Sequence, residues 1–329
     1  MLLPTTTVTR LLFCLLLGHT GSLWAQTELE EAGRLTKARN FQEAQVILER
    51  NLKATPNNAE ALALMGELQL VTRNPEKAAE FADRAIAVDG GKARYHLLRG
   101  NALGMLAQQV NFMRAMTMTG DIRGAFEKAV ELEPRNRKAR FALFSYFLVA
   151  PSVAGGGLDK ALVFAEQTVA LDAAIGHQMK GQILQKQKNA AAALTEFRLA
   201  LAADPRLPSI NNIMGYLALE MKQVDVALEH FHKQVDIEPE NANSFDSLAD
   251  GWMAKGKPDE AVTAYRKALA LNPLFPSSLL GLGKALEQVG RQQEAIAHYR
   301  HSAQAGVQNA LPAVVKESKA RLVALGAKD

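Results

Sequence analysis

Small and apolar residues recur along the chain at fixed distances before three prolines that stand 34 residues apart, Pro205, Pro239 and Pro273. These positions are Ala200, Phe197, Ala193 and Gly181 before the first proline, Phe231, Ala227 and Gly215 before the second, and Ala268, Tyr265, Ala261 and Ala249 before the third. A fixed period of this length with small residues at set places is typical of repeats built from two helices joined by a turn. The pattern therefore predicts a solenoid made only of helices.

The role of each place follows from the packing of two neighbouring helices. Small side chains at the eighth and twentieth places let the first helix of a repeat (helix A) approach its second helix (helix B) closely. An aromatic side chain at the twenty-fourth place fills the remaining space. The closing proline ends helix B, because proline cannot donate the backbone hydrogen bond that would continue the helix.

With these residues the chain resembles the tetratricopeptide repeat (TPR) family. The resemblance implies an all-α fold, an α-solenoid forming a right-handed superhelix of about eight TPR-like helix–turn–helix repeats. We expect the repeats to cover residues 26–307 and an amphipathic helix over 308–329 to cap the last one. The regular copies run from Ala174 to Pro273. Degenerate copies start near Ala25, Ala59, Ala93, Arg137 and Pro276.

Two neighbouring copies depart from the period. The third carries about ten extra residues near 105–118, and the fourth carries about five near 151–157. Leu106, Val110 and Met113 share helical spacing, so we expect helix A of the third copy to run on by two or three turns. This Met-rich extension either packs on the neighbouring glycine loop or forms an adaptable docking edge for a partner.

The first residues have the features of an export signal. Arg10 precedes a short apolar run, and Ala25 is a small residue at a cleavage site, so we expect residues 1–25 to be a secretory signal peptide. The apolar run is shorter than the roughly 20 residues that a membrane span needs. Cleavage would remove Cys14, the only cysteine, which leaves no disulfide and no cysteine-based metal site.

Composition and motifs argue against an enzyme. The 38 basic and 34 acidic residues give a net charge of +4, which is too small for a dedicated nucleic-acid surface. The glycine run 155–157 is not followed by the Lys-Ser/Thr of a phosphate loop, and no His-Glu-x-x-His or Gly-x-Ser-x-Gly motif occurs. His298 and His301 could share a helix face but have no carboxylate at ligand spacing. We therefore expect no catalytic residue, no metal and no cofactor.

The resemblance places the candidate binding surface on helix A, because four places of this helix line the concave groove of TPR arrays. Carried over to this chain, these places include Lys138, Phe141, Gln178, Gln182, Asn212, Tyr216, Asp246 and Asp250. Asp246 and Asp250 stand four residues apart, where two acids repel each other unless a cation is near. They are either a solvated acidic turn or an anchor for a basic peptide. The Lys/Asn arrangement that clamps a peptide carboxylate in some family members is not matched.

These observations predict a non-enzymatic scaffold or adaptor for protein–protein interaction. It would bind an extended peptide or a partner protein in the groove, in the bacterial periplasm or cell envelope, without nucleic acid and without stable membrane insertion after signal cleavage. One alternative is an enzyme-accessory or glycan-binding envelope protein, although the groove offers few aromatic side chains for a sugar. Another is a homo-oligomer joined through the Met-rich insertion.

Overall fold

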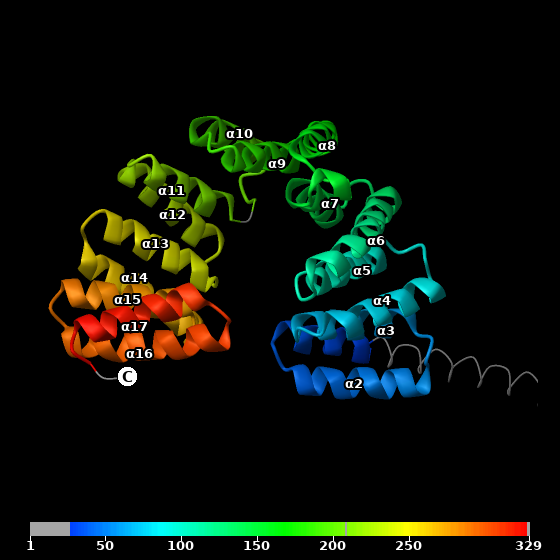
Figure 1. Cartoon of the computed structure of the whole chain (residues 1–329), viewed down its shortest axis with the longest axis horizontal. Helices are drawn as coiled ribbons and strands as arrows, with labels where there is room; N and C mark the ends of the chain where they lie inside the picture. Colours follow the sequence, from blue (N-terminus) through cyan, green and yellow to red (C-terminus); the bar gives the residue numbers. More distant parts are fainter. Residues whose placement is uncertain (1–26, 208, 328–329) are drawn as a thin grey trace, which may run out of the picture. The chain divides into compact units, whose positions relative to one another are not determined.

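The protein is helical throughout the parts that its structure describes, residues 27–207 and 209–327. In this computed structural model, successive helices pack beside one another within each of two compact units, and no strand occurs within those ranges (Figure 1). The predicted all-α solenoid is confirmed. The signal peptide predicted for residues 1–25 lies outside the described residues.

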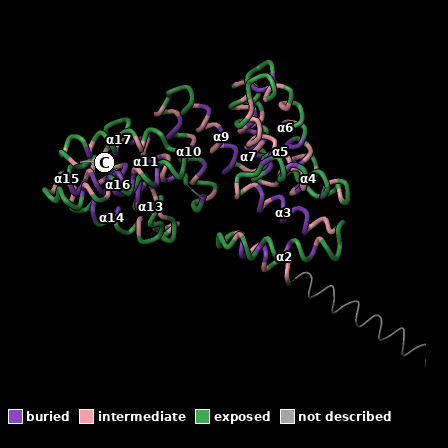
Figure 2. The backbone as a smooth tube through the Cα atoms, turned by 60° about the horizontal axis from the view of Figure 1, so that its bottom comes forward, coloured by how far each residue is buried: buried purple, intermediate pink, exposed green. Residues whose placement is uncertain are grey.

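The chain forms two compact units, which divide in the sequence after Leu171. Besides the helical residues 27–37, the first unit contains α2 (Phe41–Ala54), α3 (Ala59–Val71), α4 (Pro75–Val88), α5 (Ala93–Ala107), α6 (Phe112–Leu132), α7 (Arg137–Val149), the short 3-10 helix η1 (Ser152–Ala154) and α8 (Leu158–Leu171). The second unit contains α9 (Ala173–Lys186), α10 (Ala190–Ala203), α11 (Ile210–Glu220), α12 (Val224–Ile237), α13 (Ala242–Ala254), α14 (Pro258–Leu271), α15 (Pro276–Gln288), α16 (Gln292–Gln308) and α17 (Pro312–Ala324). Buried residues lie along the helices, whereas the turns between them are mostly exposed (Figure 2).

Asparagine and proline side chains fix where many of these helices begin. The side-chain oxygens of Asn58 and Asn136 accept hydrogen bonds from backbone N–H groups in the first turns of α3 and α7. Pro75 and Pro258 occupy the first positions of α4 and α14, where a missing N–H costs no helical hydrogen bond. Helices A and B therefore start at corresponding places in different copies.

Glycine residues on helix A face aromatic rings on helix B. A Cβ atom added at Gly215 would lie 2.3 Å from the ring of Phe231, and one added at Gly181 would lie 2.6 Å from the ring of Phe197. Both rings are completely buried. Similar glycine–aromatic contacts join α5 to α6 and α15 to α16. Because atoms do not pack so closely, only glycine admits the ring at these places.

Phe231 also reaches the next copy. A Cβ atom added at Gly251, on α13, would lie 2.8 Å from the other edge of the Phe231 ring. The ring is therefore held between a glycine of its own repeat, Gly215, and a glycine of the following repeat.

The extra residues of the third copy lengthen helix B rather than helix A. α5 ends at Ala107, and α6 begins at Phe112 and is 21 residues long. The expectation that helix A runs on is wrong, because the side chain of Asn111 accepts a hydrogen bond from the N–H of Arg114 and so starts a new helix. The apolar spacing that suggested one continuous helix runs across this break.

The lengthened α6 packs against the loop that holds the second insertion. The hydroxyl of Tyr146, on α7, donates to the carbonyl oxygen of Ala154 at 2.5 Å and lies 3.1 Å from that of Thr119, on α6. A Cβ atom at Gly156 would lie 2.0 Å from the carbonyl oxygen of Ala150, so the loop needs glycine to close this tightly.

The two expected roles of the Met-rich segment fall on different parts of α6. Met118 packs against the apolar cluster around Phe126 and Leu143. Phe112 and Met113, at the start of the helix, are 71% and 75% exposed. One part of the segment is partly buried against the core, and the first turn of α6 is an exposed apolar tip.

The C-terminal helix α17 lies within the segment for which we predict a cap. It packs against α15 and α16, with Leu322 buried and Val323 75% exposed. Lys284 of α15 forms an ion pair with Glu317 of α17.

The glycine–aromatic contacts make a stability prediction. Gly215→Ala should lower the free energy of unfolding by about 1–3 kcal/mol, because the added methyl group forces the buried Phe231 ring out of its site. Gly124→Ala is the matched control: nothing lies near its Cβ position within α6, so alanine should stabilise the helix by about 0.5–1 kcal/mol. Urea unfolding followed by circular dichroism measures both changes. Equal effects of the two substitutions would contradict the close-packing argument.

Candidate functional site

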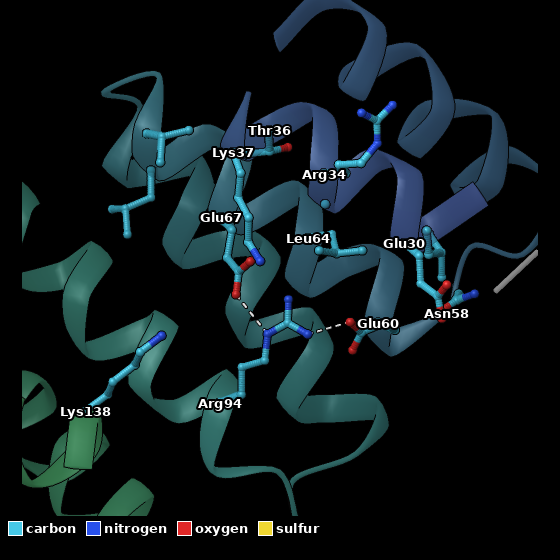
Figure 3. A pocket seen from close by; sticks show the side chains of 14 residues that line it. Glu30, Arg34, Thr36, Lys37, Asn58, Glu60, Leu64, Glu67, Arg94 and Lys138 are labelled. Carbon is cyan, nitrogen blue, oxygen red and sulfur yellow. Dashed lines mark hydrogen bonds and ion pairs between the residues drawn. The ribbon is translucent and has the colours of Figure 1, made fainter. Parts of the chain in front are cut away.

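A hollow of about 1140 Å³ opens on the first unit, and we call it the N-terminal hollow. It is formed by the helical residues 29–37, by α3 and α5, and by the start of α7 (Figure 3). Its lining residues are Leu29, Glu30, Gly33, Arg34, Thr36, Lys37, Asn58, Glu60, Leu64, Glu67, Leu70, Val71, Arg94 and Lys138. The first helices of successive repeats thus supply an apolar base and charged side chains of both signs.

Arg94 is the fixed charge of the N-terminal hollow. Its guanidinium forms ion pairs with Glu60 and, at 2.8 Å from Nε, with Glu67 (Figure 3). Burial acts to lower the pKa of Arg94, but hydrogen bonds and charges from Glu67 and Glu60 outweigh it and raise the pKa above its ordinary value. Since both acids lie on α3, Arg94 bridges two carboxylates of the neighbouring helix, which links α3 to α5 and orients the guanidinium.

Lysines add positive charge to the same hollow. Lys37 and Lys138 line it from different helices, and both are exposed. Among the described residues neither has an ion-pair partner. Phe141, one turn after Lys138, is outside the lining; its ring is half-buried and lies 5.8 Å from the ring of Phe144.

In the second unit, the predicted groove residues lie on α9, α11 and α13. Gln178 and Gln182, on α9, are partly exposed. Asn212, on α11, is also partly exposed, and its Oδ1 atom is buried without a hydrogen-bond partner in the described part of the chain.

The structure brings Tyr216, Asp246 and Asp250 together. The hydroxyl of Tyr216 donates to Asp250 at 2.8 Å and lies 3.1 Å from the hydroxyl oxygen of Ser247. Tyr265, on α14, donates to the other oxygen of Asp250. Burial and the Asp250 charge raise the pKa of Tyr216 and of Tyr265 above the ordinary value, so both phenols are neutral donors.

Asp246 lies deeper than Asp250. It is only 5% exposed, and the hydroxyl groups of Ser277 and Ser278, in the first turn of α15, donate to its carboxylate. Burial and the nearby Asp250 raise the pKa of Asp246 to about 6, although the serine hydrogen bonds oppose this shift. Neither alternative from the sequence describes this side chain, because a solvated turn and a peptide anchor both require an exposed carboxylate.

We call this set of side chains the acid–hydroxyl cluster. Its members are Tyr216, Asp246, Ser247, Asp250, Tyr265, Ser277 and Ser278. The sequence pointed to three of them through the groove positions. The hydrogen bond of the Tyr265 hydroxyl was not predicted, because this residue stands at the aromatic packing place. No sequence motif distinguishes the two serines that follow Pro276.

No other chemistry is evident in the described part of the chain. Within residues 27–207 and 209–327, no group of three or more His, Cys, Asp or Glu side chains is placed to hold a metal ion. Over the same residues, each helix is either too short or too polar to cross a bilayer.

From the acid–hydroxyl cluster we predict how much the Tyr265 hydroxyl contributes to stability. Tyr265→Phe keeps the ring but leaves Asp250 without one donor, so the free energy of unfolding should fall by about 1.5–3 kcal/mol. Tyr95→Phe is the control, since its hydroxyl lies 3.4 Å from Glu60 and contributes less. The midpoint of urea unfolding at pH 7.5 measures both. A loss no larger for Tyr265→Phe than for Tyr95→Phe would contradict the role of this hydroxyl.

Comparison with known families gives one consistent result. Tetratricopeptide repeat models match residues 35–102, 176–207 and 248–310. These segments include copies that the sequence period identifies as degenerate as well as regular ones.

Several curated proteins are similar in sequence. The type IV pilus assembly protein PilF of Pseudomonas aeruginosa is 26% identical over 203 residues, covering 60% of this chain and 80% of PilF. Superkiller complex protein 3 of Homo sapiens and tetratricopeptide repeat protein 21B of Mus musculus are each 22% identical, over 263 and 288 residues. The chain spans only 16% and 21% of the lengths of these two proteins.

Two solved structures have a similar fold. Yeast Tom70 superposes with a TM-score of 0.66 and 15% identity, covering 87% of this chain and 59% of Tom70. A chain of the APC/C hetero-tetramer Cut9–Hcn1 superposes with a TM-score of 0.53 and 16% identity, covering 86% of this chain and 52% of that chain. These two structures show a similar fold, and the matches to the tetratricopeptide repeat models, with the 34-residue period, show that the chain belongs to the tetratricopeptide repeat family.

Proposed function

We propose that this protein is a scaffold or adaptor that binds an extended segment of a partner protein along the helices A of its repeats. TPR proteins are generally scaffolds for protein–protein interaction, and this type of repeat is typically non-enzymatic. The observation that carries the proposal is the N-terminal hollow, which is lined by the first helices of successive repeats. An extended segment can cross such helices and meet each of them in turn.

The side chains of the hollow suit a peptide. Leu64 and Leu70 offer apolar contact, while Lys37 and Lys138 offer donors that no acid of the described chain occupies. Arg94 is already held by its ion pairs, so its orientation costs no further entropy when a partner binds. A mixture of fixed and available polar groups favours a peptide with at least one carboxylate.

In the second unit, the proposed contacts are the partly exposed amides and the outer members of the acid–hydroxyl cluster. Gln178, Gln182 and Asn212 can each donate and accept hydrogen bonds, as a peptide backbone requires. Tyr216 and Asp250 are partly exposed, whereas Asp246 lies behind them. Asp246 would therefore act on a partner through its charge rather than by direct contact.

We place this activity in the bacterial periplasm or cell envelope. The support is the export signal proposed for residues 1–25 and the similarity to PilF, a type IV pilus assembly protein. We also propose that the segment 26–307 is the solenoid and that 308–329 caps it, which fits the packing of α17 on α15 and α16.

The partner-binding proposal is tested by charge reversal. Mature protein fixed to a support should retain a specific partner from envelope extract. Lys37→Glu with Lys138→Glu should reduce this retention at least 10-fold, because two charges that face the hollow are reversed. A control with Lys77→Glu and Lys53→Glu changes the net charge equally on helices B, outside the lining, and should retain the partner. Failure to retain any partner, or equal loss in both variants, would count against the proposal.

A second candidate function is self-association through the exposed apolar tip of α6. Phe112 and Met113 are 71% and 75% exposed there, which is unusual for two adjacent large apolar residues. This alternative predicts a dimer whose dissociation constant rises at least 10-fold in Met113→Glu. Light scattering over a concentration series measures it, with Val88→Glu as a control at a separate, 46% exposed site. A monomer at every concentration would exclude this candidate.

A further inference from the structure

The contact between α13 and α15 depends on a carboxyl group that is almost completely buried. Asp246 is 5% exposed, and its two oxygens accept hydrogen bonds from Ser277 and Ser278. Both serines belong to the first turn of α15. These hydrogen bonds, together with apolar packing, hold the start of α15 against α13.

The groups that face Asp246 supply no positive charge. On its own helix the nearest charged group is Asp250, and the phenols of Tyr216 from α11 and Tyr265 from α14 point to that second acid. From α15 it meets only the serine hydroxyls. Among the described residues, no Lys, Arg or His shifts the pKa of Asp246.

On α12, the remaining helix that packs on α13, four titratable side chains have partners other than Asp246, and a fifth, His232, packs edge-on against Trp252. Lys233 pairs with Glu229 along α12, and Asp225 pairs with Lys255 at the far end of α13. His230, with a pKa lowered by burial, contacts Asn211 of α11.

A buried carboxylate without a cation is costly, because burial removes its hydration and a second acid repels it. A neutral carboxyl group removes both costs and still takes part in hydrogen bonds with the serines. We propose that Asp246 makes the α13–α15 contact proton-responsive: uptake of one proton in mildly acidic solution tightens the contact, and release of the proton loosens it. This inference does not depend on the proposed partner.

The direction in which pH changes the stability follows from the pKa of Asp246 in the folded and in the unfolded chain. Burial and Asp250 raise the pKa of Asp246 in the folded chain to about 6, compared with an ordinary value of 3.8. The stabilisation from protonation is therefore complete below pH 3.8 and is lost as the pH rises through about 6. In the unfolded chain the same group is already ionised at pH 5, so the window between pH 5 and 7.5 isolates the folded-state proton.

Other groups titrate in this window with the opposite sign. Burial lowers the pKa of His230 and of His298, so their contribution to stability is lost as the pH falls. The pH dependence of the whole protein therefore mixes several groups. A variant at position 246 removes only one of them, and the difference between variant and unchanged protein is the informative quantity.

The test is hydrogen exchange of the α15 backbone amides in the full chain, corrected for the intrinsic pH dependence of exchange. Relative to Asp246→Asn, the local opening constant of the unchanged protein should fall about 10-fold between pH 7.5 and 5.0. Asp225→Asn is the matched control, because this acid is at the surface of the same unit with its side chain 83% exposed. It should leave the pH dependence of the unchanged protein intact.

A second variant keeps the test valid if Asp246→Asn does not fold. Ser278→Ala removes a donor that stabilises the carboxylate, so the pKa of Asp246 should rise further. The pH at which α15 loosens should therefore move upward, toward neutral pH. The proposal is overturned if α15 exchange has the same pH dependence in Asp246→Asn and in the unchanged protein. It is also overturned if Ser278→Ala leaves the midpoint where it was.

Discussion

The fit of an aromatic ring against a bare glycine backbone is the contact on which the rest of the structure depends. At Gly215 and Gly181, no side chain larger than hydrogen leaves room for the facing ring. This contact sets how closely helix A and helix B approach. Because helix A also carries the candidate binding side chains, their positions are determined by packing on the opposite side of the same helix.

Polar contacts then act at two levels of burial. Arg94 with Glu60 and Glu67 is a partly exposed bridge that orients charge in the N-terminal hollow, and solvent weakens its contribution to stability. Asp246 is nearly free of solvent, so its ionisation is opposed by burial rather than screened. The first arrangement suits recognition, and the second couples helix packing to protonation.

The fold could be predicted from the sequence because its signals are local and periodic. Gly215 and Phe231 recur at the fixed spacing that close packing of helix A on helix B requires, and Pro239 recurs where helix B ends. The structure has this glycine–ring contact, and α12 ends before Pro239. The boundary between α5 and α6 was mispredicted, because the cap at Asn111 outweighed an apolar spacing that continued past it.

The candidate site was less predictable, since it depends on contacts between repeats. The repeat pattern predicted Asp246 as a groove residue. Its burial could not be predicted in this way, because it depends on where α15 begins relative to α13. Ser278 looks like any helix-start serine in the sequence. Tyr265 packs at the aromatic place of its repeat, and its hydroxyl also donates a hydrogen bond to Asp250. The repeat pattern predicts only the packing role, because any aromatic residue satisfies it.

The ring of Phe231, held between Gly215 and Gly251, limits how an array of this kind can grow or shrink in evolution. Gly215 is the eighth residue of its copy, a place where glycine recurs as Gly181 and Gly283, but Gly251 is the tenth residue of its copy, where the neighbouring copies have Leu217 and Ala285. Loss of the copy that contains Gly251, or insertion of a further copy in front of it, would therefore bring a side chain larger than hydrogen under the Phe231 ring. The order of the copies at this point is thus constrained by one ring, although every copy has the same period.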